Sequence, residues 1–335
     1  MTYSDREKLK RLRETFDRNY RVSRLYADYL SIYPEFLNKE MIDAICEGSD
    51  ITDREAIYAL LCQLFGFDDE LAEDRRIMRE YLLPSIRVFD AKKYEENPYC
   101  KKIAPEPRRL GAWEIKWERY PAYRAAICDD IILNPDCSEI FPLGFFRDGL
   151  SFPAVLEDGN EWMTLTPVDV DTSEEAISRA HGRVVTFGLG LGYYTYMASM
   201  KDEVESVTVV ERSEDIIRLF KELILPKFEH KEKIRIVCSD AFEYAEKIMP
   251  GEGFDFAFVD TWRDASDGAP MYERMKALEH LSPNTEFTYW IENFLVSRLR
   301  SLKFEELWDK YESGSEDAPK SYAEFIERLG YGRDT

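Results

Sequence analysis

The chain has 335 residues, and its 66 acidic residues outnumber its 45 basic residues to give a formal net charge of −21 at pH 7. Because polyphosphate binding depends on clustered lysine and arginine, this balance disfavours a nucleic-acid partner. Hydrophobic residues make up 44% of the chain, so a packed core is expected, and the length allows two domains or one domain with a large extension.

The sequence offers no membrane or export signal. No apolar run reaches the length of a bilayer span, and the first ten residues lack the apolar core of a signal peptide. The six cysteines are scattered, with neither a CxxC pair nor a zinc-ligand spacing. We therefore expect a cytoplasmic protein with no membrane partner and no metal site.

Residues 1–96 are predicted to form a helical bundle. Apolar residues recur at helical spacing in its first helix, at Leu9, Leu12, Phe16 and Tyr20. Thr52 and Glu55 fit a capping box that starts a later helix, and a further helix from about Asp69 is expected to stop at Pro84. Because no reactive side chains converge in this region, we expect a structural or substrate-covering role, or a homodimer through these helices.

Residues 97–180 are predicted to be a β-rich region that connects the bundle to the next domain and forms its substrate side. Trp113, Ile115 and Trp117 alternate with charged residues, as in a half-buried strand. The apolar stretches on either side of Asp158-Gly159 predict a hairpin with a tight turn. Thr172, Ser173 and Glu174 are interpreted as the start of a short helix.

Residues 181–295 alternate between strand and helix patterns, which predicts an α/β fold with a parallel sheet. The predicted strands are Val184 to Phe187, Ser206 to Val210, Ile234 to Cys238, Phe254 to Val259 and about Phe287 to Ile291. Helices are expected from about Tyr193, Glu214, Ala241 and Met271. Residues 296–335 are predicted to be a helical tail.

The first of these strands leads into the loop Gly188-Leu189-Gly190-Leu191-Gly192. A strand, a glycine-rich turn and a helix bring backbone N–H groups against a polar or anionic ligand. Tyr193 occupies the position where the dinucleotide pattern GxGxxG needs its last glycine, so that pattern is absent.

Three acids follow successive strands. Glu211 ends the second strand, Asp240 follows the third, and Asp260 follows the fourth. Since the carboxyl ends of parallel strands share one edge of the sheet, the three side chains are expected to meet the glycine loop there. Glu211 is suited to accept both hydroxyls of a ribose, and Asp240 is equally suited to cap the helix that follows it.

The glycine loop, together with the runs SVTVVE, IRIVCSDAFEY and FDFAFVD, resembles the catalytic domain of class I S-adenosylmethionine-dependent methyltransferases. It is especially similar to the spermidine synthase branch. The resemblance covers about residues 181–293 and implies a Rossmann-like methyltransferase sheet that binds S-adenosylmethionine. The cofactor-binding set that it implies is Gly188, Leu189, Gly190, Gly192, Glu211, Arg212, Asp240, Ala241 and Asp260.

The resemblance also implies that Asp260 lies near the sulfonium and acts as the catalytic residue. An acid at this position can accept a proton from an attacking amine or hydroxyl, or orient it. Trp262 and Asp264 in the same loop, and Glu292 after the fifth strand, are the predicted substrate contacts. Trp262 is equally compatible with plain core packing. A divalent cation held by Asp260, Glu292 and Asn293 is the minor alternative to a metal-free site.

We therefore expect an enzyme, an S-adenosylmethionine-dependent methyltransferase that acts on a small-molecule or protein acceptor. Aminopropyl transfer from decarboxylated S-adenosylmethionine is the first alternative. It is disfavoured because the second acid after the fourth strand, Asp264, comes one residue later than in that branch. A non-catalytic cofactor-binding or interaction protein is the second alternative.

Overall fold

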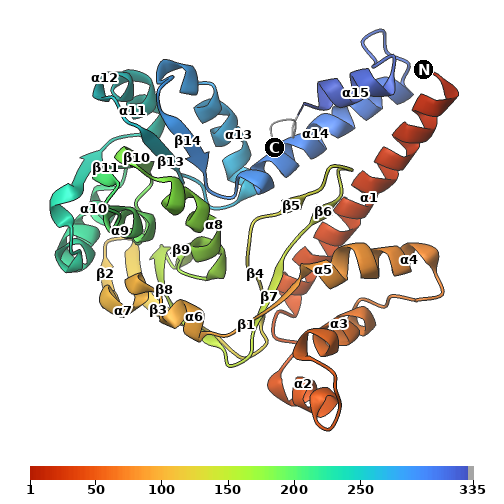
Figure 1. The fold of residues 1–335 in the computed structure, drawn as a ribbon, viewed down its shortest axis with the longest axis horizontal. Helices are drawn as coiled ribbons and strands as arrows, with labels where there is room; N and C mark the ends of the chain where they lie inside the picture. Colours follow the sequence, from red (N-terminus) through yellow and green to blue (C-terminus); the bar gives the residue numbers. More distant parts are fainter. Residues whose placement is uncertain (331–335) are drawn as a thin grey trace. The chain divides into compact units, whose positions relative to one another are not determined.

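The computed structural model describes residues 1–330, which form two compact units (Figure 1). Unit 1 contains Met1–Phe89, Ala122–Arg147 and the chain from Asn293 onward, and unit 2 contains Asp90–Pro121 and Asp148–Glu292. Neither unit is one continuous stretch of sequence. Residues 331–335 of the predicted helical tail lie outside the described residues.

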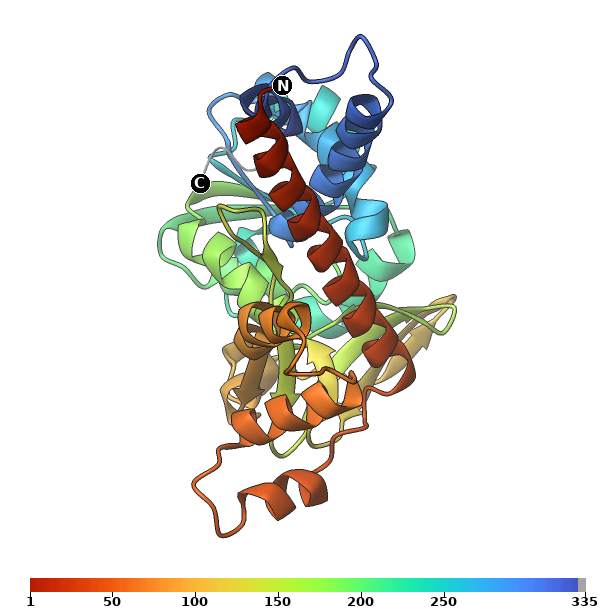
Figure 2. The same cartoon turned by 90° about the vertical axis from the view of Figure 1, so that its right-hand side faces the viewer.

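Unit 1 is mainly helical. Its helices are α1 (Tyr3–Ile32), α2 (Lys39–Cys46), α3 (Asp53–Leu64), α4 (Ala72–Ile77), α5 (Leu83–Ser85), α15 (Tyr322–Leu329) and α14 (Glu292–Glu312), whose first residue belongs to unit 2. The predicted capping box at Thr52 and Glu55 is confirmed, because each side chain accepts from the backbone N–H of the other residue. The first half of the long helix α1 packs against α14 and α15 through Phe16, Phe304 and Phe325, and Figure 2 shows the course of these helices. The second half of α1 packs against α3 and the strands of unit 1.

Unit 1 also contains strands. β1 (Ile86–Phe89), β7 (Leu143–Phe146) and β4 (Ala125–Ile127) form a sheet in the order β1-β7-β4. β5 (Ile132–Leu133) pairs with β6 (Glu139–Ile140). Part of the region predicted to be β-rich therefore pairs with β1, a strand that the sequence analysis missed at the end of the helical region.

Unit 2 begins with two short helices, α6 (Lys92–Glu95) and α7 (Pro98–Lys102), and an antiparallel sheet. The sheet has the order β2-β3-β8-β9, from β2 (Arg108–Leu110), β3 (Trp113–Tyr120), β8 (Leu150–Glu157) and β9 (Asn160–Thr164). The predicted hairpin is confirmed, since β8 and β9 pair antiparallel and Asp158 and Gly159 both have positive φ, as a tight turn requires.

The five-stranded sheet of unit 2 is entirely parallel and has the order β12-β11-β10-β13-β14. Its strands are β10 (Gly182–Phe187), β11 (Val204–Glu211), β12 (Ile234–Cys238), β13 (Phe256–Val259) and β14 (Glu286–Tyr289). All five were predicted, with ends that differ by up to two residues. In chain order the strands are arranged 3-2-1-4-5, which is compatible with a Rossmann-like fold.

Helices cover both faces of this sheet, with α9 and α10 on one side and α11 to α13 on the other (Figure 1). They are α9 (Tyr193–Ser199), α10 (Glu214–Leu219), α11 (Ala241–Lys247), α12 (Met249–Glu252) and α13 (Ala265–Lys276). Short π or 3-10 turns are η1 (Met78–Leu82), η2 (Phe220–Ile224), η3 (Leu225–Lys227), η4 (Lys231–Lys233) and η5 (Glu279–Leu281). The predicted starts at Tyr193, Glu214 and Ala241 are confirmed.

Two predicted helix starts are wrong. The helix assigned to Thr172 is α8 (Pro167–Arg179), which begins five residues earlier because Thr166 and Asp169 form a capping box and Pro167 takes the first helical position. The helix assigned to Met271 is α13, which begins at Ala265 because Asp264 caps it and accepts from the backbone N–H of Ser266.

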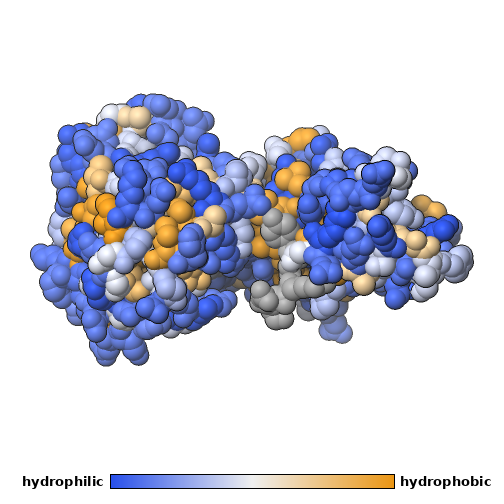
Figure 3. Space-filling view, turned by 90° about the horizontal axis from the view of Figure 1, so that it is seen from above, coloured by the Kyte–Doolittle hydropathy of each residue, from blue (hydrophilic) through white to orange (hydrophobic). Residues whose placement is uncertain are grey.

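The face drawn in Figure 3 is mostly hydrophilic, with apolar side chains in separate small patches, as the excess of charged residues leads one to expect. Among the described residues, no helix combines the length and the apolar character that crossing a membrane requires.

Candidate functional site

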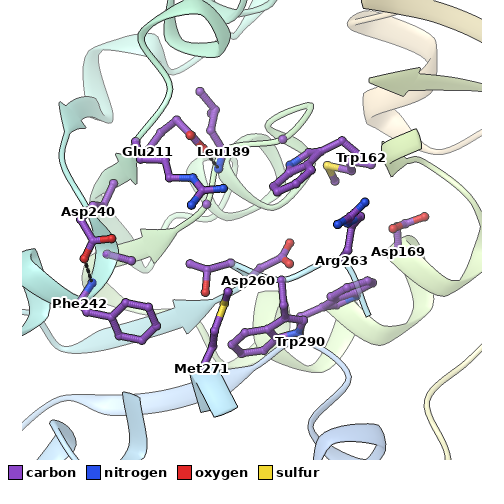
Figure 4. Close-up of a pocket in the computed structure, with 18 of the residues that line it drawn as sticks. Trp162, Asp169, Leu189, Glu211, Asp240, Phe242, Asp260, Arg263, Met271 and Trp290 are labelled. Carbon is purple, nitrogen blue, oxygen red and sulfur yellow. Dashed lines mark hydrogen bonds between the residues drawn. The ribbon is translucent and has the colours of Figure 1, made fainter. Parts of the chain in front are cut away.

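One cavity of unit 2 lies at the carboxyl edge of the parallel sheet (Figure 4). Its lining comes from the end of β9, the start of α8, the glycine loop, the ends of β11, β12, β13 and β14, and α13. The lining residues are Glu161, Trp162, Met163, Thr164, Val168, Asp169, Gly188, Leu189, Gly190, Val210, Glu211, Arg212, Ser239, Asp240, Ala241, Phe242, Asp260, Thr261, Trp262, Arg263, Met271 and Trp290.

The position of the cavity follows from the sheet topology. β10 lies between β11 and β13, because the chain passes from β10 to β11 and β12 on one side and then crosses over to β13 and β14 on the other side. The backbone N–H of Gly188 donates to Val210 O, and that of Asp260 donates to Phe187 O, both at 2.9 Å. The ends of the three strands are therefore joined at the switch point, where open parallel sheets bind ligands.

Close packing explains part of the glycine content of the loop. Gly188 has a φ of 99°, and a Cβ there would collide with the backbone carbonyl of Asp260. Gly192 has a φ of 73°, and a Cβ would collide with the Phe220 ring. Gly188, Leu189 and Gly190 line the cavity, whereas Gly192 is not among the described residues that line it. Glycine at position 192 thus serves the packing of α9 against η2.

Glu211 joins the glycine loop to the next segment of the chain. Its carboxylate accepts from the backbone N–H of Leu189 at 3.2 Å (Figure 4). It also accepts from the backbone N–H of Ser213 at 2.8 Å. Burial raises the pKa of Glu211, against the opposing effect of these hydrogen bonds. The two carboxylate oxygens keep further lone pairs, so this side chain can still accept hydrogen bonds from a ligand.

Asp240 is the cap of α11. One carboxylate oxygen accepts from the backbone N–H groups of Phe242 and Glu243, each at 3.0 Å. Asp240 and Ala241 also line the cavity. The structure therefore gives Asp240 the capping role that the sequence left open, and its second oxygen remains compatible with a ligand contact.

Asp260 is the most strongly perturbed acid of the cavity. Burial, and the nearby charges of Asp169 and Glu211, raise the pKa of Asp260 to about 8. Its side chain makes no hydrogen bond to any residue in the part of the chain that the structure describes. An acid held in this way keeps its proton at neutral pH and becomes a stronger base once it loses that proton.

Asp169 is a cavity residue that the sequence analysis missed. One of its oxygens accepts from the backbone N–H of Thr166 at 2.8 Å and from the Thr166 hydroxyl at 2.7 Å. Burial raises the pKa of Asp169 to about 6. The pattern Thr166 to Asp169 could have given the helix start correctly, but nothing in the sequence indicates that this helix end faces the strand ends.

Three tryptophans line the cavity. The Trp162 ring has the guanidinium groups of Arg212 and Arg263 within 6.0 Å of its centroid. The Trp290 indole N–H donates to the Thr172 hydroxyl at 2.9 Å. Neither of these two tryptophans was predicted as a site residue, because no local sequence pattern indicates that their side chains face the cavity.

Trp262, the tryptophan that was predicted, is only 4% exposed and stacks on Tyr289 with ring centroids 6.3 Å apart. It therefore packs in the core and forms part of the cavity wall at the same time.

Two predicted substrate residues have other contacts. Asp264 caps α13, and Glu292 accepts from the Tyr272 hydroxyl at 2.7 Å and lies 3.6 Å from Lys276 Nζ. Neither Asp264 nor Glu292 is among the described residues that line the cavity. Asn293 donates to Asp130 and Ile131 within unit 1. Within residues 1–330, no cluster of three or more histidine, cysteine, aspartate or glutamate side chains is arranged to hold a metal ion.

The cavity therefore combines hydrogen-bond acceptors at two strand ends, an acid with a raised pKa, and aromatic walls. Glu211 and Asp240 can bind hydroxyl or amino groups of a nucleoside-like ligand, and Asp260 can take or hold a proton beside them. Arg212 and Arg263 are the two cationic side chains of the lining, against five acids.

No family model matches the sequence, and no curated protein matches it. Among solved structures, the chain is similar to one titled "Crystal structure of a putative O-methyltransferase from Klebsiella pneumoniae", with a TM-score of 0.25 and 18% sequence identity. The similarity covers 31% of this chain and 46% of that chain, which is less than half of its length. At this TM-score the similarity carries no argument about fold or activity.

Proposed function

We propose that the protein is an S-adenosylmethionine-dependent methyltransferase that acts on a small-molecule or protein acceptor. One observation carries the proposal. The glycine loop and the acids Glu211, Asp240 and Asp260 line a single cavity at the switch point of a parallel sheet with the strand order 3-2-1-4-5. This is the edge at which folds of this topology bind nucleotides and related cofactors.

The residues of the cavity fit such a cofactor. Glu211 would accept hydrogen bonds from the ribose hydroxyls, with its orientation held by the N–H groups of Leu189 and Ser213. Asp240 and Ala241 would face the adenine, because the Asp240 oxygen that does not cap α11 is available for the exocyclic amino group. The methionine part would lie along Gly188 to Gly190.

When bound, S-adenosylmethionine supplies an electrophilic methyl group on a positively charged sulfur. In its deprotonated form, Asp260 would orient the attacking hydroxyl or amine of the acceptor and take the proton that this group loses, as the bond from the nucleophile to the methyl carbon forms and the bond from that carbon to sulfur breaks. Since its pKa is raised to about 8, Asp260 is matched to proton transfer near neutral pH. Methyl transfer otherwise needs alignment of the nucleophile with the methyl group and the sulfur, to which the rigid strand ends contribute.

Isothermal titration calorimetry of the full chain with S-adenosylmethionine and S-adenosylhomocysteine tests the cofactor assignment. We expect both to bind with dissociation constants in the micromolar range, and adenosine to bind more weakly because it lacks the methionine part. No detectable heat with either compound at high micromolar concentration would remove the basis of the proposal.

Aminopropyl transfer is the second candidate function, and the charge of the cavity favours it. Even with Asp260 protonated, the acids Glu161, Asp169, Glu211 and Asp240 outnumber Arg212 and Arg263 in the lining, and decarboxylated S-adenosylmethionine carries more net positive charge than its parent compound. A markedly tighter binding of the decarboxylated compound in the same titration would support this second function over methyl transfer.

We further propose that the protein works in the cytoplasm, without a nucleic-acid or membrane partner, and that the N-terminal helices can mediate a homodimer. The dimer is tested by multi-angle light scattering of the full chain across a hundredfold range of concentration. A mass of about 39 kDa at every concentration would rule it out.

A further inference from the structure

Met163, near the end of β9, covers part of the glycine loop. The backbone N–H of Leu191 donates to the thioether sulfur of Met163 at 3.1 Å. The same sulfur lies where a Cβ on Gly190 would stand, so a side chain at position 190 would collide with it. Met163 and Gly190 both line the cavity.

The hydrogen bond to Met163 is a weak one for a backbone N–H of this loop. A thioether sulfur is a poor acceptor. A carboxylate oxygen would make a shorter and stronger, charge-assisted bond with the same N–H. A ligand carboxylate that takes the place of the Met163 sulfur would therefore make a stronger hydrogen bond with the Leu191 N–H, and this would favour its binding.

The surroundings of Met163 allow it to move. β9 is an edge strand of its sheet and pairs with β8 alone, with an irregular register between Val155 and Leu156. Met163 is only partly buried. Because the methionine side chain is unbranched and has three rotatable bonds, it can change its packing at low cost.

We propose that Met163 is a specificity-determining residue, a displaceable cover that a cofactor with a carboxylate group moves aside to reach the Leu191 N–H. The inference rests on the proposed function and adds to it the way in which the site distinguishes S-adenosylmethionine from its decarboxylated form. Displacing Met163 breaks its hydrogen bond with the Leu191 N–H. The carboxylate of S-adenosylmethionine replaces that bond with a stronger one, whereas the decarboxylated compound has no group that can do so.

The test compares these two compounds, which differ only in the carboxylate, by isothermal titration of the wild type, Met163→Ala and Met163→Leu. We expect Met163→Ala to bind S-adenosylmethionine about two- to tenfold more tightly than the wild type, the range of one hydrogen bond. We expect its affinity for the decarboxylated compound to change less than about twofold. Met163→Leu keeps the bulk but loses the acceptor, so we expect a smaller change with the same sign.

Met271→Ala is the matched control, because Met271 lines the same cavity from α13. It should leave the ratio of the two affinities as it is in the wild type. The inference is overturned if the Met163 variants change both affinities by the same factor, or if they weaken S-adenosylmethionine selectively. If the wild type binds neither compound, the proposed function itself fails, and the inference falls with it.

Discussion

Burial and the two neighbouring acids, Asp169 and Glu211, all raise the pKa of the Asp260 carboxyl group. The native state therefore holds a proton on Asp260 up to a pH of about 8, while the unfolded chain releases it near the ordinary value of 3.8. Between these values the native state binds more protons than the unfolded state, so the contribution of Asp260 to the free energy of unfolding falls as the pH rises.

We expect Asp260→Asn to raise the melting temperature at pH 8.5 by about 2–4 °C, because it removes a buried charge that costs at least about 1 kcal/mol. At pH 5 the difference should be clearly smaller, because most of the interval between 3.8 and 8, over which the wild type loses stability, lies above that pH. Thermal unfolding followed by circular dichroism at both pH values measures the difference. Asp202→Asn, at an exposed position before β11, should show no such pH dependence, and a shift of equal size at both pH values would contradict the assignment.

Glu211 gives the second prediction for a single residue. Glu211→Ala should weaken the binding of S-adenosylhomocysteine by about 1–3 kcal/mol, since it removes a charged acceptor from the ribose hydroxyls. Isothermal titration measures the change. The matched control is Glu205→Ala, an exposed position of the same strand at its opposite end. A Glu211→Ala variant that is folded and binds with unchanged affinity would refute the ribose contact.

The three strand-end acids could be predicted from the sequence because each follows a short apolar run, and the edge that they share is a property of every parallel sheet. Asp169 and Trp162 could not be predicted in this way. They reach the cavity from the start of α8 and from the β8–β9 hairpin, and no local pattern states which edge of the sheet these elements face. Asp264 was predicted as a substrate contact because it is close in sequence to Asp260, and in the structure its side chain caps α13.

At the scale of elements, the glycine loop packs backbone against backbone on the end of β13, at Gly188 and Asp260. Gly188→Ala would force the backbone of β10 away from that of Asp260, since neither partner is a flexible side chain. We expect it to lower the free energy of unfolding by more than about 3 kcal/mol. Urea unfolding measures this.

The control for Gly188 is Gly159→Ala in the β8–β9 turn. Gly159 also has a positive φ, of 80°, but a Cβ there would meet nothing within 4 Å. Gly159→Ala should lower the free energy of unfolding by about 1–2 kcal/mol, because of backbone strain alone. Equal costs at the two positions would mean that the contact with Asp260 is unimportant.

Element types were easier to predict than element ends. The five strands of the parallel sheet follow from their apolar runs, and the hairpin follows from Asp158-Gly159. β1 was missed because its four residues directly follow a helical region and lack a clear alternation. The starts of α8 and α13 were placed too late because the acids at positions 169 and 264, which fix the first turns through capping, were not interpreted as caps.

In the molecule as a whole, unit 1 is held together by a buried ion pair between distant segments. Glu139 and Arg300 are 2% and 3% exposed, and their side chains are hydrogen-bonded to each other. The Ser297 hydroxyl also donates to Glu139 at 2.9 Å, and the backbone N–H of Glu139 donates to Asn19. The pair thus connects β6, α14 and α1.

Arg300→Met should lower the free energy of unfolding of unit 1 by about 3–5 kcal/mol, because it leaves the Glu139 charge buried without its partner. The double variant Glu139→Gln with Arg300→Met should recover most of this loss. Differential scanning calorimetry measures both. Arg76→Met breaks the exposed pair with Glu80 in the same unit and should cost less than about 1 kcal/mol. A similar small cost for Arg300→Met would show that the buried pair contributes little.

The division of the chain also sets an order of assembly during synthesis on the ribosome. Unit 1 needs α14 and α15, which follow Glu292 in the chain except for the first residue of α14. Every segment of unit 2 has been translated once Glu292 is reached. Since domains generally fold as units while the chain grows from its N-terminus, the unit with the glycine loop can complete its fold first. The apolar residues in the first half of α1, which include Leu9, Leu12 and Phe16, stay uncovered until α14 and α15 emerge. The second half of α1 packs instead with α3 and with the strands of unit 1, which are translated earlier. A chain truncated just after Glu292 and released from the ribosome should therefore already contain the cavity of unit 2, while the first half of its helix α1 remains sensitive to protease.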